Sequence, residues 1–377
     1  MFPVKKKLND HEKINWLRLI RTENIGPMTF YQLLRQCGSI DQVFERLPQM
    51  AKNGGRLDGL KIPSITEIES EIEKLHKIGG EFIFACEPNY PYNLGFVEDA
   101  PPVLSTIGNL NLLTKTSLAV VGSRNSSMNG EKFAFNISQE IGRSGYVIIS
   151  GLARGIDRYA HLGSIETGTI GVLAGGINVI YPPENEKLYH DMKEKGLIIA
   201  ENPFGMEPIA RHFPKRNRIV SGIAKGVLVV EAALRSGSLI TARFALEQGR
   251  DVFAVPGSPF DPRCKGTNGL LREGAILVEK AEDITNILSQ SKQSSFLDES
   301  EHSYDAGLPI SPDENDVKIG REILMSKLGT TPIEIDSLLD HCDLTTNIGL
   351  SAILELELAG KIEREAGGKI YKIDHTC

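Results

Sequence analysis

Paired cysteines and long apolar runs are both missing from this sequence of 377 residues. Its five cysteines lie far apart and form no CxxC pair, a pattern that fits free thiols in a reducing compartment and offers no metal site. No stretch approaches about 18 consecutive apolar residues, and the basic start of the chain lacks the apolar segment of a secretory signal. We therefore expect a cytoplasmic protein with no metal ion and no membrane partner.

Signatures of triphosphate binding are absent as well. The sequence contains no GxxxxGK[ST] loop, and its glycine turns do not follow the GxGxxG spacing, so a nucleoside triphosphatase is not expected. With 41% hydrophobic and 24% charged residues, the composition is that of an ordinary globular protein, and the length suggests two or three domains.

Charge is unevenly distributed along the chain. The formal net charge is -7, yet residues 101–290 contain 21 Lys and Arg against 18 Asp and Glu, whereas residues 291–377 contain 8 against 17. Because a field of one sign steers ligands of the opposite sign, a polyanion is expected to meet the middle of the chain.

Short apolar runs alternate with helical stretches in that middle part. The runs are rich in β-branched residues and lack polar alternation, as buried strands do, and they cover 118–121, 146–149, 169–173, 197–200, 227–230 and 251–255. Helices are expected between them, at 129–143, 156–167, 184–195, 215–224 and 238–248. This alternation predicts an α/β fold with a doubly wound parallel sheet, whose ligands bind beyond the carboxyl ends of the strands.

The two ends of the chain predict smaller modules. Residues 1–75 show helical periodicity broken by Gly26-Pro27, which indicates a helical hairpin that either grips a DNA backbone or only packs. Residues 289–314 are rich in Ser, Asp and Glu and are predicted to be a linker. Beyond them, 315–377 reads as three helices and a β-hairpin, a winged helix, which leaves 76–288 for the sheet domain.

Glycine and arginine follow two neighbouring strands of the predicted sheet. Gly122-Ser123-Arg124 comes after one strand, and Gly151 with Arg154 after the next, while Ser238 begins a later helix. Glycine allows a close approach, and free N–H groups of the turn and of the following helix point outward at an anion. We expect an anion-binding edge here; the alternative is a set of tight turns with solvated arginines.

Cations are concentrated in ARHFPKRNRIVSG, residues 210–222. If a helix begins after Pro214, Arg216 lies on its buried arc, Lys215 flanks that arc and Arg218 points away from it. A buried arginine must either line a cleft or be paired, because an isolated buried charge is too costly.

Two interpretations of that buried arginine stay open. One is an anion site, and the other is a structural ion pair with Glu201 or Glu231. For Phe213, which lies beside these cations, two interpretations are open as well: the ring stacks a nucleobase, or it belongs to the core.

Asp157 and His161 lie one turn apart on a predicted helix and are the nearest approach to an acid-base pair. No nucleophile accompanies them, so we interpret them as a helix-start carboxylate and a packed histidine. No catalytic residue is expected.

Six ordered motifs occupy residues 119–275: AVVGSR (119–124), SGLARGID with AH (150–161), VLAGGINVIYPPEN (172–185), FPKRNRIVSG (213–222), VVEAALRSGSLITARFALEQGRDVFAVPG (229–257) and GTNGLLREGA (266–275). Together they resemble the DNA-processing protein A family, DprA, also called Smf. The resemblance implies an extended Rossmann-like central domain between a SAM-like or helix-hairpin-helix-like N-terminal domain and a winged helix. It further implies a cytoplasmic, cofactor-free, non-enzymatic homodimer that binds and protects single-stranded DNA in natural transformation or recombination and loads the RecA recombinase onto it.

The expected DNA contacts combine that resemblance with the strand-end argument. They are Gly122, Ser123, Arg124, Arg154, Arg211, Phe213, Lys215, Arg216, Asn217, Arg218 and Ser238. The alternative function is a nucleotide-binding enzyme or sensor, since Rossmann-like pockets with glycine and serine at their strand ends commonly hold a nucleotide.

The C-terminal module departs from what a DNA-reading winged helix needs. Residues 316–377 contain 7 Lys and Arg against 11 Asp and Glu, and the expected third helix, 344–359, contains Glu355 and Glu357 but no cation. Phosphate would repel such a helix. We therefore predict that this module contacts protein or takes no part in binding.

Overall fold

The computed structural model describes residues 6–295, 312–365 and 368–373. The chain divides into two compact units, one formed by Met1–Lys7 with Ser70–His302 and the other by Leu8–Glu69 with Ser303–Cys377. Most of the predicted linker, 289–314, lies outside the described residues, although helix α11 (Ala281–Ser295) continues into its first part. The expected domain boundaries stay predictions.

The first unit contains a nine-stranded sheet of order β1-β2-β6-β5-β4-β3-β7-β8-β9. Strands from β6 to β9 pair in parallel, whereas β1 and β2 are antiparallel to their neighbours. The bounds are β1 Gly80–Phe84, β2 Val103–Gly108, β3 Ser117–Val121, β4 Val147–Ser150, β5 Thr169–Gly176, β6 Leu197–Asn202, β7 Gly226–Val229, β8 Asp251–Ala254 and β9 Ile276–Leu277. The strand order reverses at β3, which pairs with β4 on one side and β7 on the other.

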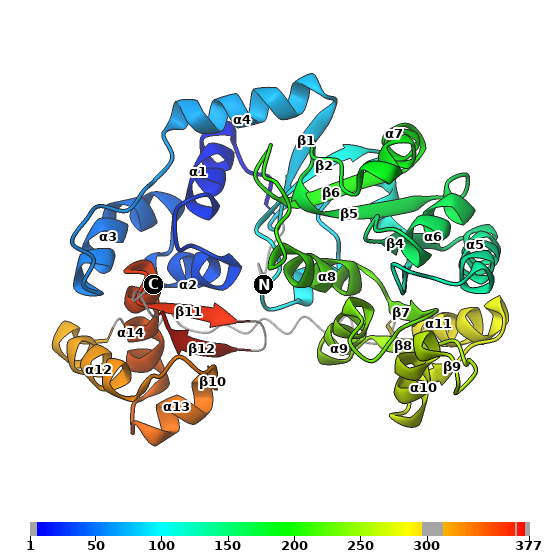
Figure 1. Ribbon diagram of the computed structural model, residues 1–377. Helices are drawn as coiled ribbons and strands as arrows, with labels where there is room; N and C mark the ends of the chain where they lie inside the picture. Colours follow the sequence, from blue (N-terminus) through cyan, green and yellow to red (C-terminus); the bar gives the residue numbers. More distant parts are fainter. Residues whose placement is uncertain (1–5, 296–311, 366–367, 374–377) are drawn as a thin grey trace. The chain divides into compact units, whose positions relative to one another are not determined.

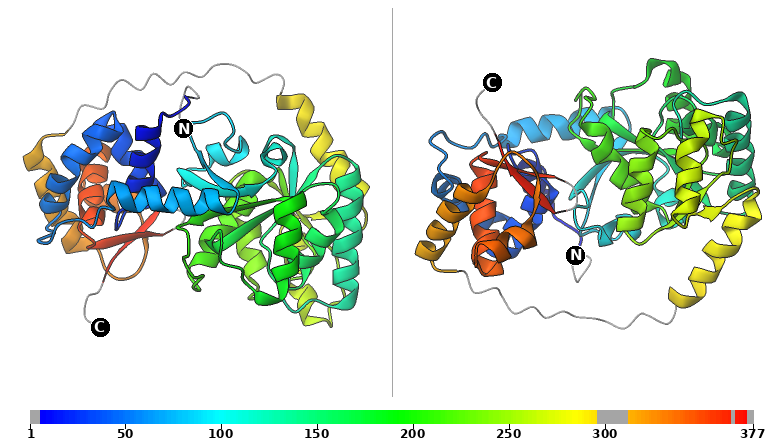
Figure 2. Two further views of the ribbon diagram at one scale, coloured as in Figure 1. Left: turned by 90° about the horizontal axis from the view of Figure 1, so that it is seen from above. Right: turned by 60° about the horizontal axis from the view of Figure 1, so that its bottom comes forward.

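Helices cover both faces of this sheet, as Figures 1 and 2 show. They are α4 Ile65–Lys77, which crosses the unit boundary, then α5 Met128–Arg143, α6 Ile156–Ser164, α7 Glu186–Lys195, α8 His212–Ile223, α9 Gly237–Glu247, α10 Lys265–Arg272 and α11. Alternate residues of β3 serve opposite cores: Leu118 and Val120 pack with α5, α6 and α11, whereas Ala119 and Val121 pack with α8, α9 and α10.

The predicted α/β fold with a large, mostly parallel sheet is confirmed, and all six predicted strands are present. Strands β1, β2 and β9 were not predicted. In β2, buried hydroxyls interrupt the apolar run, with Ser105 Oγ donating to the carbonyl of Ala200 (3.0 Å) and Thr106 Oγ1 to that of Glu81 (2.9 Å). A strand whose buried side chains are polar does not show the pattern used to predict it.

The second unit combines the two ends of the chain. Its helices are α1 Asp10–Ile20, α2 Pro27–Cys37, α3 Ile40–Asn53, α12 Glu314–Lys327, α13 Ile335–His341 and α14 Thr346–Leu358. A three-stranded sheet of order β10-β12-β11, from β10 Ile333–Glu334, β11 Ile362–Glu365 and β12 Lys369–Lys372, completes it. The predicted N-terminal helical module and C-terminal winged helix are therefore both confirmed. Within the described ranges, no helix has the length and apolar character needed to span a membrane.

Candidate nucleic-acid interface

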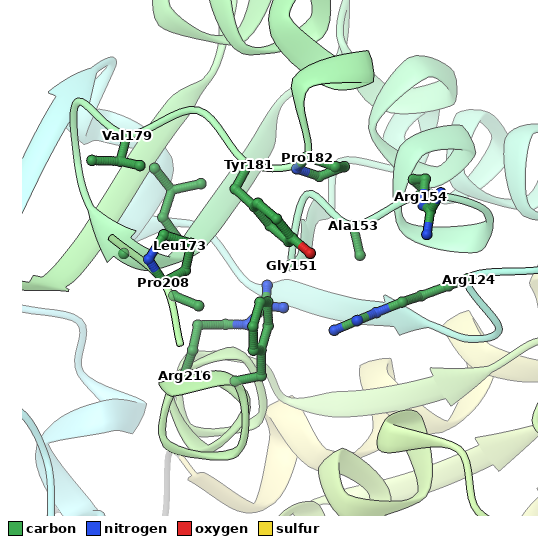
Figure 3. A pocket seen from close by; sticks show the side chains of 13 residues that line it. Arg124, Gly151, Ala153, Arg154, Leu173, Val179, Tyr181, Pro182, Pro208 and Arg216 are labelled. Atoms are coloured by element: carbon green, nitrogen blue, oxygen red, sulfur yellow. The ribbon is translucent and has the colours of Figure 1, made fainter. Parts of the chain in front are cut away.

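A pocket opens at the carboxyl ends of β3, β4 and β5. It is lined by the turns after β3 and β4, by β5 and the chain that follows it, and by α8 with the segment before it; the residues are Arg124, Gly151, Ala153, Arg154, Leu173, Ala174, Gly175, Val179, Tyr181, Pro182, Pro208, Phe213 and Arg216. Figure 3 shows Arg124 and Tyr181 directed toward one another, with Arg216 rising from α8 beside them. The pocket lies where an open parallel sheet is expected to bind its ligand.

A carboxylate fastens the turn after β3 from within. Ser127 donates its backbone N–H to Oε2 of Glu231 (2.9 Å) and its hydroxyl to Oε1 (2.5 Å), while its Oγ accepts the N–H of Gly130 at the start of α5. Gly122 lies so close to Ile156 that a side chain at position 122 would overlap it. The expectation of free amides here is wrong for Ser127, because Glu231 occupies the N-terminus of α5.

Asp157 fastens the turn after β4 in a similar way. Its Oδ2 accepts the N–H groups of Gly151 (3.1 Å) and Ala153 (3.4 Å). Burial raises the pKa of this carboxyl, and the Arg216 cation and the two amides oppose the shift. These amides, too, are already bonded to a protein carboxylate.

Arg216 is a buried residue of the pocket lining. Its Nη1 donates to the carbonyl of Val172 (2.8 Å), and its guanidinium is so close to Gly151 that no side chain fits there. Burial lowers the pKa of Arg216 to about 10, with Asp157 opposing the shift, so the group stays charged at neutral pH. Arg216 is therefore a buried cation that lines the pocket and interacts electrostatically with Asp157.

His161 is packed below this pair. Its Nδ1 lies 2.7 Å from Oγ1 of Thr169, which itself donates to the carbonyl of Ile148. Burial, and then the charge of Arg216, lower the pKa of His161 to about 3, so the ring is neutral. The interpretation of Asp157 and His161 as structural groups agrees with this geometry.

Four exposed cations surround the pocket or the start of α8. Arg124 and Arg154 belong to the lining, Arg211 is the N-cap residue of α8, and Lys215 lies near the start of that helix. Burial, followed by the charges of Arg211 and Lys215, lowers the pKa of the intervening His212. Arg154 has one neighbour of opposite charge, with its Nη1 3.6 Å from Glu184 on an exposed surface where such a pair is weak.

Phe213 has two partners at the mouth of the pocket. The guanidinium of Arg124 lies 4.8 Å from its ring centroid, and the ring of Tyr181 lies 5.7 Å away. Tyr181 was missed in the sequence, although it belongs to the motif VLAGGINVIYPPEN. Cation and aromatic faces together form a surface of the kind on which nucleobases stack.

Arg218 does not face solvent. Its Nη2 donates to both carboxylate oxygens of Glu201 (2.6 and 2.7 Å), its Nε lies 3.3 Å from Oδ2 of Asp99, and its Nη1 donates to the Asp99 carbonyl. Burial alone would lower the pKa of Arg218, but the two carboxylates raise it above its ordinary value. The expectation that Arg218 points away from the buried side is wrong, because α8 is buried on both sides.

The suggested partners of Arg216 are likewise corrected. Glu201 pairs with Arg218, and Glu231 bonds to Ser127; the carboxyl group whose charge acts on the pKa of Arg216 is that of Asp157. The sequence indicated a buried arginine but not which carboxylate it would meet.

Three remaining candidates lie outside the pocket lining. Ser238 is buried and its Oγ lies 2.8 Å from that of Ser236, the residue that caps α9. Asn217 donates to the carbonyl of Gly237 (3.2 Å), and the Oγ of Ser123 accepts the N–H of Asn125 (3.2 Å). Their DNA contacts stay predictions, whereas Arg124, Arg154, Phe213 and Arg216 are brought together.

Among the residues that the structure describes, no three His, Cys, Asp or Glu side chains are grouped so that they could hold a metal ion.

Sequence and structure comparisons identify related proteins. The model of DNA recombination-mediator protein A matches residues 81–289, a DprA-like N-terminal HHH domain matches 10–73, and a DprA winged helix domain matches 311–368. Protein Smf of Escherichia coli K12 is 40% identical over 313 residues, which is 82% of each chain.

Two solved structures are similar as well. DNA processing protein A from Streptococcus pneumoniae has 32% identity and a TM-score of 0.62 over 74% of this chain and 98% of its own. The Helicobacter pylori protein, described for its mode of single-stranded DNA binding, has 28% identity and a TM-score of 0.52 over 56% of this chain and 96% of its own. With a family model over more than half of its length and such relatives, the chain belongs to the DprA/Smf family.

Proposed function

We propose that this protein binds single-stranded DNA through the pocket at the carboxyl ends of β3 to β5. The observation that carries the proposal is the grouping of exposed Arg124 and Arg154 with Phe213 and Tyr181 around a buried cation, Arg216. Cations meet phosphates and aromatic faces meet bases, and a pairing of this kind binds single strands with little regard to sequence. The single-stranded DNA bound by the related Helicobacter pylori protein supports it.

The buried groups give this surface a fixed form. Asp157 holds the amides of the turn after β4, and Glu231 holds the turn after β3 that presents Arg124. The backbone that carries these cations is therefore already ordered before a DNA strand enters the pocket. This lowers the entropic cost of binding. Arg211 and Lys215 would extend the cationic track along the start of α8.

We further infer the role of a mediator rather than of an enzyme. Asp157 and His161, the pair nearest to acid-base chemistry, are buried and bonded within the protein. Family membership supports protection of incoming DNA during transformation or recombination, loading of RecA and action as a homodimer in the cytoplasm. The four described cysteines, all free thiols, fit that compartment. RecA filament assembly on protein-coated strands, and molar mass by light scattering, test the RecA and dimer proposals.

Fluorescence anisotropy with a labelled mixed-sequence oligonucleotide tests the binding site. Arg124→Ala is expected to weaken binding to all sequences alike and to reduce the slope of log affinity against log salt by about 0.7, the value for one phosphate contact on a single strand. Arg143→Ala is the matched control, because Arg143 is exposed at the far end of α5, and it should leave the slope unchanged. An unchanged slope in Arg124→Ala, or displacement of the strand by a mononucleotide, would contradict the proposed site.

A further inference from the structure

Helix α14, the third helix of the winged-helix module, is buried on two sides. Ala352, Ile353 and Leu356 belong to the core of that module. Leu354 and Leu358 are fully buried too, although at about 100° per residue they lie on the opposite side of the helix. A second partner must therefore cover this opposite side.

That partner is the N-terminal helical module, which belongs to the same compact unit. From α2, Gln32 Nε2 donates to the carbonyl of Leu350 (2.7 Å) and Gln36 Nε2 to Oγ of Ser351 (3.1 Å). From the end of α3, Asn53 Nδ2 donates to Oε1 of Glu355 (3.3 Å). Figure 1 shows α14 beside α2 and α3.

Backbone packing at this contact is tight. Gly54, the residue that follows α3, has ordinary helical dihedral angles, so its conformation does not require glycine. A Cβ added there would overlap the carbonyl of Glu355 and approach the Cβ of Ala359. The missing side chain at position 54 is thus explained by the presence of α14.

The same helix fills the end of the N-terminal hairpin. Oε2 of Glu357 lies 3.4 Å from Thr29 Oγ1 in the first turn of α2, and Asn24 Nδ2 reaches the carbonyl of Leu358 (3.5 Å). Arg364 donates to both oxygens of Glu357 (2.9 and 3.1 Å), which balances its charge inside the protein. A DNA phosphate at this turn would have to displace a paired carboxylate.

We propose that α14 is an internal docking helix whose partner is the N-terminal helical module of this chain. In a DNA-reading winged helix the corresponding helix enters the major groove. Here the helix has no Lys or Arg, and its outer side is already covered by α2 and α3. Residues 8–69 and 312–373 then form one discontinuous domain. In this domain, neither the hairpin turn of the N-terminal module nor helix α14 of the winged-helix module is open to DNA.

To test this proposal, the full chain is cleaved at a specific protease site introduced between residues 296 and 311. After cleavage, the C-terminal fragment should stay with the rest of the chain through size-exclusion chromatography. Gly54→Leu should release it, because the new side chain overlaps α14. Gly59→Leu, the matched control, should retain it, since no heavy atom lies within 4 Å of a Cβ at that position.

A second pair of measurements separates undocking from unfolding. Trp16, the single tryptophan, is buried in α1 with its ring 5.0 Å from that of Phe30, so its emission reports whether the N-terminal module stays folded. If Gly54→Leu unfolds that module, the double variant Gln32→Ala, Gln36→Ala decides the matter. Loss of its two hydrogen bonds should lower the affinity of the C-terminal fragment for the rest of the cleaved chain by at least about fivefold. The proposal would be overturned if the C-terminal fragment separated from the cleaved chain that carries no substitution, or if the fragment stayed bound equally well in all variants.

Discussion

Arg218→Met tests whether Arg218, one of the cations of residues 210–222, stabilises the fold rather than binding a ligand. The side chain of Arg218 is 5% exposed, and it binds the carboxylates of Glu201 (18% exposed) and Asp99 (30% exposed). Methionine has a similar length and no charge, so the substitution leaves two acidic groups without their cation. We expect a large loss of stability in the sheet unit and no direct loss of a DNA contact.

The magnitude follows from the burial of the three groups. Removal of one partner from a buried pair costs about 3–5 kcal/mol, chiefly because an uncompensated charge is left behind. Asp99 is partly exposed and regains water, which places the expected loss near the lower end, at about 3 kcal/mol. Arg243→Ala is the control: its side chain is 66% exposed and pairs with Glu247 one turn away, an interaction worth only about 0.3–0.5 kcal/mol.

Urea unfolding with two probes measures this loss where it is expected. Far-UV circular dichroism follows both units, whereas Trp16 fluorescence follows only the second unit. Arg218→Met should shift the dichroism transition and leave the Trp16 transition in place. Adding Glu201→Gln should recover at least about 1 kcal/mol, because it removes the charge of one of the two carboxylates that Arg218 binds. A loss below about 1 kcal/mol, or equal shifts in both probes, would refute the reasoning.

Two further predictions concern the buried histidine and the aromatic surface. His161 has its pKa lowered to about 3 in the folded protein, so its contribution to stability is complete above its ordinary pKa of about 6.5 and is lost as the pH falls toward 3. The free energy of unfolding should therefore be about 2 kcal/mol lower at pH 5 than at neutral pH because of this histidine. His161→Leu should remove that part of the pH dependence in urea titrations. Phe213→Ala and Tyr181→Ala should each weaken single-strand binding about tenfold without changing the salt slope, whereas Phe213→Tyr should bind normally. Unchanged affinity in both alanine variants would contradict base stacking at these rings, and a reduced slope in Phe213→Ala would show that the ring holds Arg124 against a phosphate.

The fold could be predicted from the sequence because its central strands are buried on both faces. Runs such as 118–121 and 227–230 consist of apolar residues, and helices separate them at regular intervals. Strand β2 escaped prediction because Ser105 and Thr106 are buried through hydrogen bonds rather than by apolar packing. The docking of α14 against the N-terminal module could not be predicted either, because hydrophobic periodicity is a local pattern and the contacting residues Gln32 and Leu350 are 318 positions apart.

The sequence indicated where the candidate site residues lie in the fold, but not which residues they pair with. Arg124, Arg154 and Arg216, which belong to the strand ends and the cationic stretch, line one pocket, and their contact with DNA stays a prediction. The helical-wheel argument failed for Arg218, because a wheel assumes one solvent-facing side and α8 has little of one. Tyr181 follows an irregular segment, so only the folded chain brings its ring to Phe213.

The occupied amides bear on which anion the pocket serves. Rossmann-like nucleotide sites commonly bind phosphate with the N–H groups at a helix N-terminus. Here Ser127 gives its N–H to Glu231, and Gly151 and Ala153 give theirs to Asp157, so these donors are not offered to a ligand. Phosphates would instead meet side-chain cations, which make longer and more adaptable contacts along a polymer backbone. Such contacts depend strongly on salt, and this is why the slope of affinity against salt, rather than affinity alone, separates a DNA strand from a mononucleotide as the ligand.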